Sequence, residues 1–199
     1  MGNEAHIPDR IAELLVHLGR AAQSENARSD LTAAQWTCLR FFARANGSPR
    51  TPSAFASFQA TTRGTASQII KSLERRGLVS ATRSERDRRS VCFDLTDTGR
   101  AMLDHDPLRV LVDLIDELDG ADSVQFLTTL SGLASALAAK RDAASFGTCR
   151  DCSHFGTTGD AAYCACMAAD LAADETTKLC ASYAPMLGNH NEENRDATG

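Results

Sequence analysis

The 199-residue sequence predicts a mostly helical fold with one small β-hairpin, an α+β arrangement. Three observations lead to this prediction. Alanine and leucine dominate a composition in which only 6% of residues are aromatic, which favours helices. Apolar residues recur at helical spacing along much of the chain up to about residue 140. Two short segments, LVSATR and SVCFDLT, instead look like strands, and the second alternates with the β-strand period of two.

The first two helices are predicted from apolar spacing and from a capping signal. The first covers residues 7–21 (IPDRIAELLVHLGRA), where aliphatic side chains repeat at helical spacing. The polar stretch SENARSD follows as a linker. The second helix begins at LTAAQ, where Thr32 and Gln35 form a capping box that satisfies free backbone N–H groups. This helix is expected to end near Gly47.

Two further helices are predicted between residues 51 and 77. Thr51 is a suitable N-cap for the first, and Pro52 suits its first helical position. Thr62 can cap the second, and Gly77 is expected to end it as a C′ glycine. The buried stripe of this last helix is expected to comprise Ala66, Ile69, Ile70 and Leu73.

The two predicted strands are joined by SERDRR, which is too polar to bury and is rich in arginine. The order helix, helix, helix, strand, basic loop, strand indicates a helix-turn-helix followed by a β-hairpin wing. Residues 97–141 return to helix, with one apolar stripe between Leu111 and Leu118 and another between Phe126 and Leu137. The polar end of the chain, NHNEENRDATG, is expected to be disordered.

The net charge of −5 conceals a local basic block. Residues 61–90 contain eight Lys/Arg against three Asp/Glu, whereas residues 141–199 contain four against nine. A concentrated basic block is the electrostatic footprint of nucleic-acid binding. The sequence contains no 18-residue apolar run and no signal-peptide pattern, so a cytoplasmic protein with no membrane partner is expected.

Four segments together, LTAAQWTCLRFF, RGTASQIIKSLERRGLV, DRR and VCFDLTDTGRAML, resemble the MarR family of winged helix-turn-helix transcriptional regulators. The resemblance spans about residues 7–140 and includes, in family order, a recognition helix ending in LERRGLV, an Asp-x-Arg wing and an LT-x-x-G hinge. It implies a homodimer packed through the N-terminal helix and residues 101–140 of both chains. It also implies pseudo-palindromic operators and repression relieved by a ligand or an oxidant. The segment TPSAFASFQA departs from the family by lacking its usual leucines.

The resemblance also implies which residues bind double-stranded DNA. Arg63, Ser67 and Gln68 are expected to read base edges, because a helix with a polar face can lie in the major groove. Arg89 would enter the minor groove, and Asp87 would orient the wing. The remaining expected contacts are Thr62, Gly64, Thr65 and Lys71 on the helix, and Arg83, Arg86 and Arg88 against phosphates. The alternative is a solvated amphipathic helix followed by a charged turn.

Five cysteines lie between residues 149 and 180, in a segment that the family resemblance does not cover. Two cysteines separated by two residues place both thiolates on one tight turn, and more distant cysteines can close a four-thiolate shell. In the cytoplasm such a cluster more often binds metal or senses redox state than forms a structural disulfide. The predicted metal ligands are Cys149, Cys152, Cys164 and Cys180, with Cys166 as a spare that could exchange with Cys164.

Three chemistries fit this spacing. An irregular four-cysteine set on a regulator favours an iron–sulfur cluster, whose oxidation or loss would be the signal. A structural zinc ion is the second hypothesis, and a metal-free thiol switch at Cys152 or Cys166 is the third. The two remaining cysteines differ from this group. Cys38 is expected to be a small buried hydrophobe, and Cys92 to face away from the apolar side of its strand.

The sequence therefore predicts a homodimeric DNA-binding regulator, acting as a repressor, whose activity a cysteine-ligated metal centre modulates. The alternatives are a regulator that responds to a small-molecule effector and carries a purely structural zinc, a protein-binding adaptor, and an electron-transfer or thiol enzyme. The sequence has no phosphate loop, HExxH motif or nucleophile elbow, so no enzyme is expected. The expected organisation is an N-terminal dimerisation helix and linker (1–30), a winged helix-turn-helix (31–100), dimerisation helices (101–141), a cysteine-rich metal-binding segment (142–185) and a disordered tail (186–199).

Overall fold

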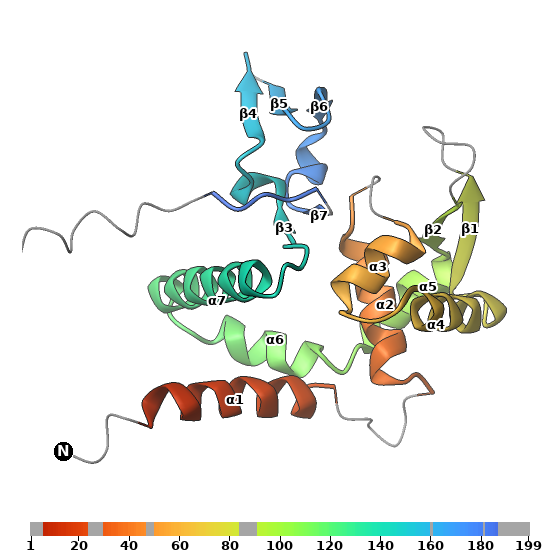
Figure 1. Cartoon of the computed structure of the whole chain (residues 1–199). Coiled ribbons are helices and arrows are strands. Elements are labelled where there is room, and N and C mark those ends of the chain that lie inside the picture. The colour runs from red at the N-terminus through yellow and green to blue at the C-terminus, as the bar shows by residue number, and fades with distance from the viewer. Residues whose placement is uncertain are drawn as a thin grey trace, which may run out of the picture. The chain divides into compact units, whose positions relative to one another are not determined.

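The computed structural model describes residues 6–23, 30–46, 50–83, 91–159, 161–180 and 182–186. These residues divide into two compact units, whose elements Figure 1 labels. The first unit takes its residues from 1–43 and 51–129. The second takes its residues from 44–50 and 130–199. The short segment 44–50 therefore groups with the C-terminal part of the chain, although it connects two elements of the first unit.

The first unit is helical with one antiparallel hairpin. Its elements are α1 (Ile7–Ala21), α2 (Ala33–Arg44), α3 (Pro52–Phe58), α4 (Arg63–Arg75), β1 (Val79–Arg83), β2 (Val91–Leu95), α5 (Asp97–Met102), the 3-10 turn η1 (Leu103–His105) and α6 (Arg109–Asp116). In the hairpin Val79 lies opposite Leu95, and Arg83 lies opposite Val91. Helix α7 (Gly120–Lys140) continues from the first unit into the second. The predicted order of helix, helix, helix, strand and strand is confirmed.

The second unit contains short strands and turns. Its elements after α7 are β3 (Gly147–Thr148), the 3-10 turn η2 (Cys149–Asp151), β4 (Phe155–Thr158), β5 (Ala161–Cys164), β6 (Ala169–Leu171), the 3-10 turn η3 (Ala173–Glu175) and β7 (Leu179–Cys180). Strands β3 and β7 pair antiparallel, and β4, β5 and β6 form a separate antiparallel sheet. We call the described residues of 147–186 the cysteine module.

The predicted helix signals are confirmed. The Thr32 N–H donates to Gln35 Oε1 at 2.9 Å and the Gln35 N–H donates to Thr32 Oγ1 at 3.3 Å, which completes the capping box. The Thr51 hydroxyl accepts from the Ala54 N–H at the start of α3, and the Thr62 hydroxyl accepts from the Thr65 N–H at the start of α4. Gly77 follows α4 with a φ of 70°, the left-handed conformation of a C′ residue.

Helix α2 ends at Arg44, three residues before the predicted end near Gly47. The reason is a contact that is distant in sequence. Ala45 forms a parallel β-bridge with Leu179, and the Asn46 N–H donates to the Leu179 carbonyl at 2.9 Å. Strand pairing takes the backbone of residues 45–46, so these residues cannot continue the i to i−4 hydrogen bonding of the helix.

An aromatic cluster forms the centre of the first unit. Phe41 lies 5.6 Å from Phe55 and 5.0 Å from Phe58, measured between ring centroids. Phe42 lies 6.1 Å from Phe93 of the hairpin, so the cluster joins α2, α3 and β2. Phenylalanines on α3 thus supply the packing that leucines were expected to supply, because each ring buries a large apolar area. Among the described residues the largest fully buried side chains include Phe41, Phe42, Phe55, Leu31, Leu39, Ile70 and Leu73.

Two details of the predicted apolar faces differ in the structure. Ile69 of the α4 stripe is half-buried, whereas Ala66, Ile70 and Leu73 are buried. On β2, Phe93 is buried, but Val91 is 47% exposed because it lies at the end of the hairpin next to the tip. The prediction for Cys38 is confirmed, since its side chain is buried between helices and burial raises the pKa of its thiol.

Helices α1, α6 and α7 contain no buried residue within their described lengths. Their predicted apolar stripes are present but lie on the surface of the single chain. For example, Leu14 is 54% exposed, Val110 is 66% exposed and Leu127 is 67% exposed. Within the described ranges, no helix combines the length and apolar character that crossing a membrane requires.

We expect Gly99→Ala to destabilise the first unit by about 1–3 kcal/mol through overpacking. A Cβ at this position would overlap the backbone carbonyl of Leu78, which cannot move aside as a flexible side chain could. The matched control is Gly64→Ala, where the nearest atom to a new Cβ is the Thr62 hydroxyl oxygen at 3.8 Å. That control should be neutral or stabilising, by up to about 1 kcal/mol, because alanine favours helix. Urea unfolding of both variants tests this, and equal midpoints would contradict it.

Candidate nucleic-acid interface and thiol cluster

Helix α4 separates a buried face from a polar face. Ala66, Ile70 and Leu73 are buried against the first unit. The residues predicted to meet DNA lie on the other side. Thr62, Arg63, Gly64, Thr65, Gln68 and Lys71 are exposed, and Ser67 is half-buried. The structure therefore brings the predicted base-reading residues onto one accessible surface, as a helix lying in a groove requires.

Polar contacts hold α4 against α2 and against the segment that leads into α2. The Gln35 side-chain amide donates to the Ser72 hydroxyl at 3.0 Å, which links α2 to α4. The Arg76 guanidinium donates to the Asp30 carbonyl at 2.6 Å, just after α4 ends. The N-terminal end of α4 carries a hydrogen bond between the Thr62 and Thr65 hydroxyls, 3.0 Å apart. These contacts and the buried stripe fix the direction in which the polar face points.

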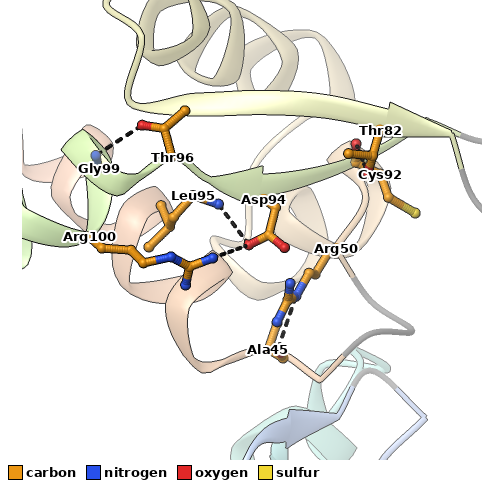
Figure 2. Close-up of polar contacts among 9 residues, drawn as sticks. All are labelled: Ala45, Arg50, Thr82, Cys92, Asp94, Leu95, Thr96, Gly99 and Arg100. Atoms are coloured by element: carbon orange, nitrogen blue, oxygen red, sulfur yellow. Dashed lines mark hydrogen bonds and ion pairs between the residues drawn. The ribbon is translucent and has the colours of Figure 1, made fainter.

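The base of the hairpin is tied to α5, as Figure 2 shows. The Asp94 carboxylate accepts from the Leu95 N–H at 2.8 Å and from the Arg100 guanidinium at 3.3 Å. The Thr96 hydroxyl accepts from the Gly99 N–H at 3.0 Å, which caps α5. The tip of the hairpin, residues 84–90, lies outside the described residues. The predicted wing contacts Arg86, Asp87, Arg88 and Arg89, together with the side chain of Arg83, therefore stay predictions.

The winged helix is similar in sequence and in fold to known proteins. Residues 29–90, which run from just before α2 to the end of the hairpin loop, match the MarR family model. The helices and the hairpin in this range form a winged helix. None of the curated proteins is significantly similar in sequence to this chain.

Solved structures share the fold of the MarR-type winged helix. The structure of S. aureus MepR in DNA-binding conformation has 20% identity and a TM-score of 0.56, and covers 65% of this chain and 97% of its own. The S. aureus MepR–DNA complex has 18% identity and a TM-score of 0.54, and covers 68% and 99%. The transcriptional regulator BldR from Sulfolobus solfataricus has 20% identity and a TM-score of 0.53, and covers 67% and 99%. At these identities the likeness establishes a common fold.

The cysteine module buries four thiols and almost nothing else. Cys149, Cys152, Cys164 and Cys180 are each 4–8% exposed, whereas Cys166 is exposed. Among the described residues after 106, Thr176 is the only other buried side chain. The four predicted ligands are thus the buried cysteines of the module, and the predicted spare is the exposed one. All seven cysteines are free thiols.

The other three buried thiols act electrostatically on Cys149. Burial raises the pKa of the Cys149 thiol to about 11, and the charges of Cys180, Cys164 and Cys152 add to this, while a hydrogen bond from Asn46 opposes it. These four sulfur atoms therefore share one region of the module. Within the described residues, however, no group of three or more His, Cys, Asp or Glu side chains has the arrangement of a metal site. The structure gathers the thiols without displaying a closed metal shell.

Short backbone elements bring these cysteines together. Cys149 opens the η2 turn, and the Cys152 N–H donates to the Cys149 carbonyl at 3.1 Å, as expected of a tight CxxC turn. Cys164 ends β5, and Cys180 ends β7 opposite Gly147. The Ala184 N–H donates to the Cys152 sulfur at 3.4 Å.

Sequence reasoning missed the hairpin in the module. The segment between Cys152 and Cys164 contains glycine and aspartate, which are typical of turns and loops. It instead forms β4 and β5, which turn at Gly159 with a φ of 62°. Strands of four residues offer too few positions for an alternating pattern to stand out.

Sequence reasoning also missed two contacts made by residues outside the cysteine pattern. The Asn46 side-chain amide points to Cys149 Sγ at 4.0 Å. The Tyr183 ring packs so closely on Gly147 that a Cβ there would lie 2.5 Å from its Cε2 atom. Burial raises the pKa of the Tyr183 hydroxyl, which is hydrogen-bonded to Ser135 of α7. No local sequence signal identifies partners that lie this far apart in the chain.

Proposed function

We propose that this protein is a transcriptional regulator that binds double-stranded DNA as a homodimer, and that it acts as a repressor. The observation that supports this most strongly is the exposed polar face of α4 in a MarR-type winged helix. Arg63 and Gln68 on this face can hydrogen-bond to base edges, and Lys71 can contact a phosphate. Two of the similar structures are described as a MepR–DNA complex and as MepR in DNA-binding conformation, which supports the same assignment.

The homodimer is supported by the exposed apolar faces of α1, α6 and α7. Soluble monomers rarely expose apolar patches larger than a few hundred Å², and larger ones mark interaction sites. A two-fold dimer would cover these faces and place two copies of α4 on successive major-groove segments of an inverted repeat. A two-fold interface uses the same surface of both chains, so it buries the same apolar stripes in each chain.

Selection from a randomised duplex DNA pool tests the DNA-binding proposal. We expect the full-length protein to enrich an inverted repeat. With that duplex, Arg63→Ala and Gln68→Ala should each weaken binding by about 5–150-fold and relax the base preference, because a lost base contact costs about 1–3 kcal/mol. Lys71→Ala should weaken binding to all sequences similarly and reduce the salt slope by about one.

The matched control is Arg109→Ala on α6, which removes the same charge from an exposed position outside α4. This variant should bind DNA as the wild type does. Binding that is independent of salt, or equal losses for Arg109→Ala and Arg63→Ala, would contradict DNA recognition by α4. The protein-binding adaptor would then be the better hypothesis.

We further propose that Cys149, Cys152, Cys164 and Cys180 hold a metal centre. The residues fit such a group because they form a set of four sulfur donors that is buried in a segment lacking an apolar core. A segment of about 40 residues with so little apolar burial normally needs metals or disulfides to fold. Four thiolates suit either an iron–sulfur cluster, which supplies redox sensing, or a zinc ion, which supplies stability. Iron, sulfide and zinc contents of one anaerobic sample, with its visible absorption, distinguish the two.

The metal decides which regulatory signal should be sought. If the centre is an iron–sulfur cluster, operator affinity should differ between intact and oxidised protein. If it is zinc and operator affinity does not respond to oxidant, the cysteines are structural and a small-molecule effector is the remaining signal. Comparison of operator binding before and after controlled oxidation separates these two cases.

A further inference from the structure

The second unit includes the segment that connects two helices of the winged helix. Residues 44–50 join α2 to α3, yet they group with the second unit. Ala45 is fully buried and Asn46 is 8% exposed. In the described residues of this unit, the other buried side chains are the four cysteines and Thr176. The loop therefore contributes to the same small interior that holds the thiols.

Backbone pairing attaches the loop next to a thiol. Ala45 bridges Leu179 in parallel, and the Asn46 N–H donates to the Leu179 carbonyl at 2.9 Å. Leu179 and Cys180 make up β7, whose other edge pairs with β3. The loop thus extends the β3–β7 pair by one strand. Cys180 lies in the middle strand, and Cys149 follows β3 directly.

The side chain of Asn46 brings the loop to the thiols themselves. Its amide nitrogen donates to Cys149 Sγ at 4.0 Å, a long contact of the kind that sulfur acceptors make. This contact places a side chain of the loop directly against one of the four buried thiols. The Arg50 guanidinium donates to the Ala45 carbonyl at 3.2 Å, so the far end of the loop closes back on the anchored end (Figure 2).

A second attachment ties the module to α7. Tyr183 packs on Gly147 of β3, and its hydroxyl is hydrogen-bonded to Ser135 on the C-terminal half of α7. The module is therefore connected to α7 on one side and to the α2–α3 loop on the other. Both attachments involve β3 or its partner strand β7. Cys149 directly follows β3, and Cys180 is part of β7.

We propose that the cysteine module is a second link between the winged helix and α7, and that Asn46 is the positioning residue that couples this link to the thiol centre. The inference rests on the metal centre proposed above. Loss of metal would disorder the β3–β7 pair, because the thiols are nearly all of its interior. Ala45 and Asn46 would then lose their strand partner. The end of α2 and the start of α3 would become freer to move.

Linkage makes this coupling reciprocal. If metal loading changes DNA affinity through the loop, DNA binding must change metal affinity by the same factor. Asn46 lies in the α2–α3 loop and not on α4, so its proposed effect on DNA would pass through the loop. Phe42 precedes that loop in the sequence and Phe55 follows it, and both side chains are fully buried.

Hydrogen exchange on the full-length protein, metal-loaded and chelator-stripped, tests the link without DNA. Stripping should increase backbone exchange in 42–46 and 52–55 by at least about tenfold, and should leave the buried stripe of α4 unchanged. In parallel, Asn46→Ala and the near-isosteric Asn46→Asp should lose metal to a chromophoric chelator about 10–100-fold faster than the wild type. Thr157→Ala, at an exposed position on β4, is the matched control and should lose metal at the wild-type rate.

The outcomes separate the link from the proposals that it rests on. A chain that takes up no metal would overturn the metal centre and this inference together. A metal-binding chain whose exchange in 42–46 does not respond to stripping would overturn the link alone, and the metal centre would stand. If Asn46→Asp retains metal as the wild type does, the amide donor has no role. That outcome would overturn the proposal that Asn46 positions the thiol centre. DNA selection that fails while exchange responds would leave the link intact and remove the regulator proposal.

Discussion

Replacing Cys149 with serine is expected to remove the metal and unfold the cysteine module, whereas Cys166→Ser should do neither. Cys149 is buried in the module beside the other three buried thiols, and Cys166 is exposed. A serine hydroxyl is a poor replacement for a thiolate ligand of iron or zinc. The pair is well matched because each variant replaces one sulfur with one oxygen in the same segment.

The expected effect is large because the thiols are most of the module's interior. Apparent binding free energies of structural zinc at four-ligand sites reach about 10–16 kcal/mol, and in small metal-dependent folds this energy is folding energy. Loss of one ligand should therefore remove the β3–β7 and β4–β5–β6 pairing. The helices of the first unit have their own aromatic core and should remain folded.

Three measurements on anaerobically purified samples check this result. Metal content per chain should fall to near zero in Cys149→Ser and stay at the wild-type value in Cys166→Ser. Alkylation under native conditions should label the remaining module thiols of Cys149→Ser, but chiefly the exposed Cys166 of the wild type. Full metal content in Cys149→Ser, or its loss in Cys166→Ser alone, would show that the ligand set is assigned wrongly.

A glutamate in place of Leu127 is expected to convert the dimer to a monomer and to abolish tight operator binding. Leu127 is 67% exposed on α7, and Phe126 and Leu133 on the same helix are also exposed. An unpaired carboxylate buried at an apolar interface costs several kcal/mol. A monomer engages one half-site, so it loses the gain of about 10²–10⁴-fold that two linked binding sites provide.

The control for this variant is Gln125→Glu, which adds the same charge two residues away on the polar side of the same helix. Gln125→Glu should remain a dimer. Light scattering reports the mass of each variant, and titration with a full inverted repeat and with a single half-site reports affinity. A dimeric Leu127→Glu would show that α7 does not contribute its apolar face to the interface. A monomeric variant with wild-type affinity for the full site would contradict two-site binding.

Local interactions explain which parts of the fold could be predicted from the sequence. The capping box of Thr32 and Gln35, the N-caps Thr51 and Thr62, and the C′ residue Gly77 each act within three to five residues of themselves. Their effects can therefore be predicted from neighbouring residues in the sequence. The polar face of α4 follows from the same local logic, because apolar residues at helical spacing determine which side is buried.

Contacts between distant segments were decided by tertiary structure. Spacing left Cys164 and Cys166 as interchangeable candidates, and pairing of β5 with β4 and β6 buries the first while leaving the second exposed. Helix α2 ends at Arg44 and not near the predicted Gly47, because Ala45 pairs with Leu179 in a β-bridge. The bridge between Ala45 and Leu179 joins residues more than 100 positions apart, and local helix propensity is too weak to resist it.

The sequence by itself therefore determined the winged helix, the polar face of α4 and the five-cysteine composition of the C-terminal segment. Only the tertiary structure decided that Asn46 of the α2–α3 loop lies against Cys149, and that Tyr183 packs on Gly147. The physical reason is that helix signals come from neighbouring residues. The short strands around the buried thiols instead pair with backbone segments that are distant in sequence, and neighbouring residues do not indicate which segments these are.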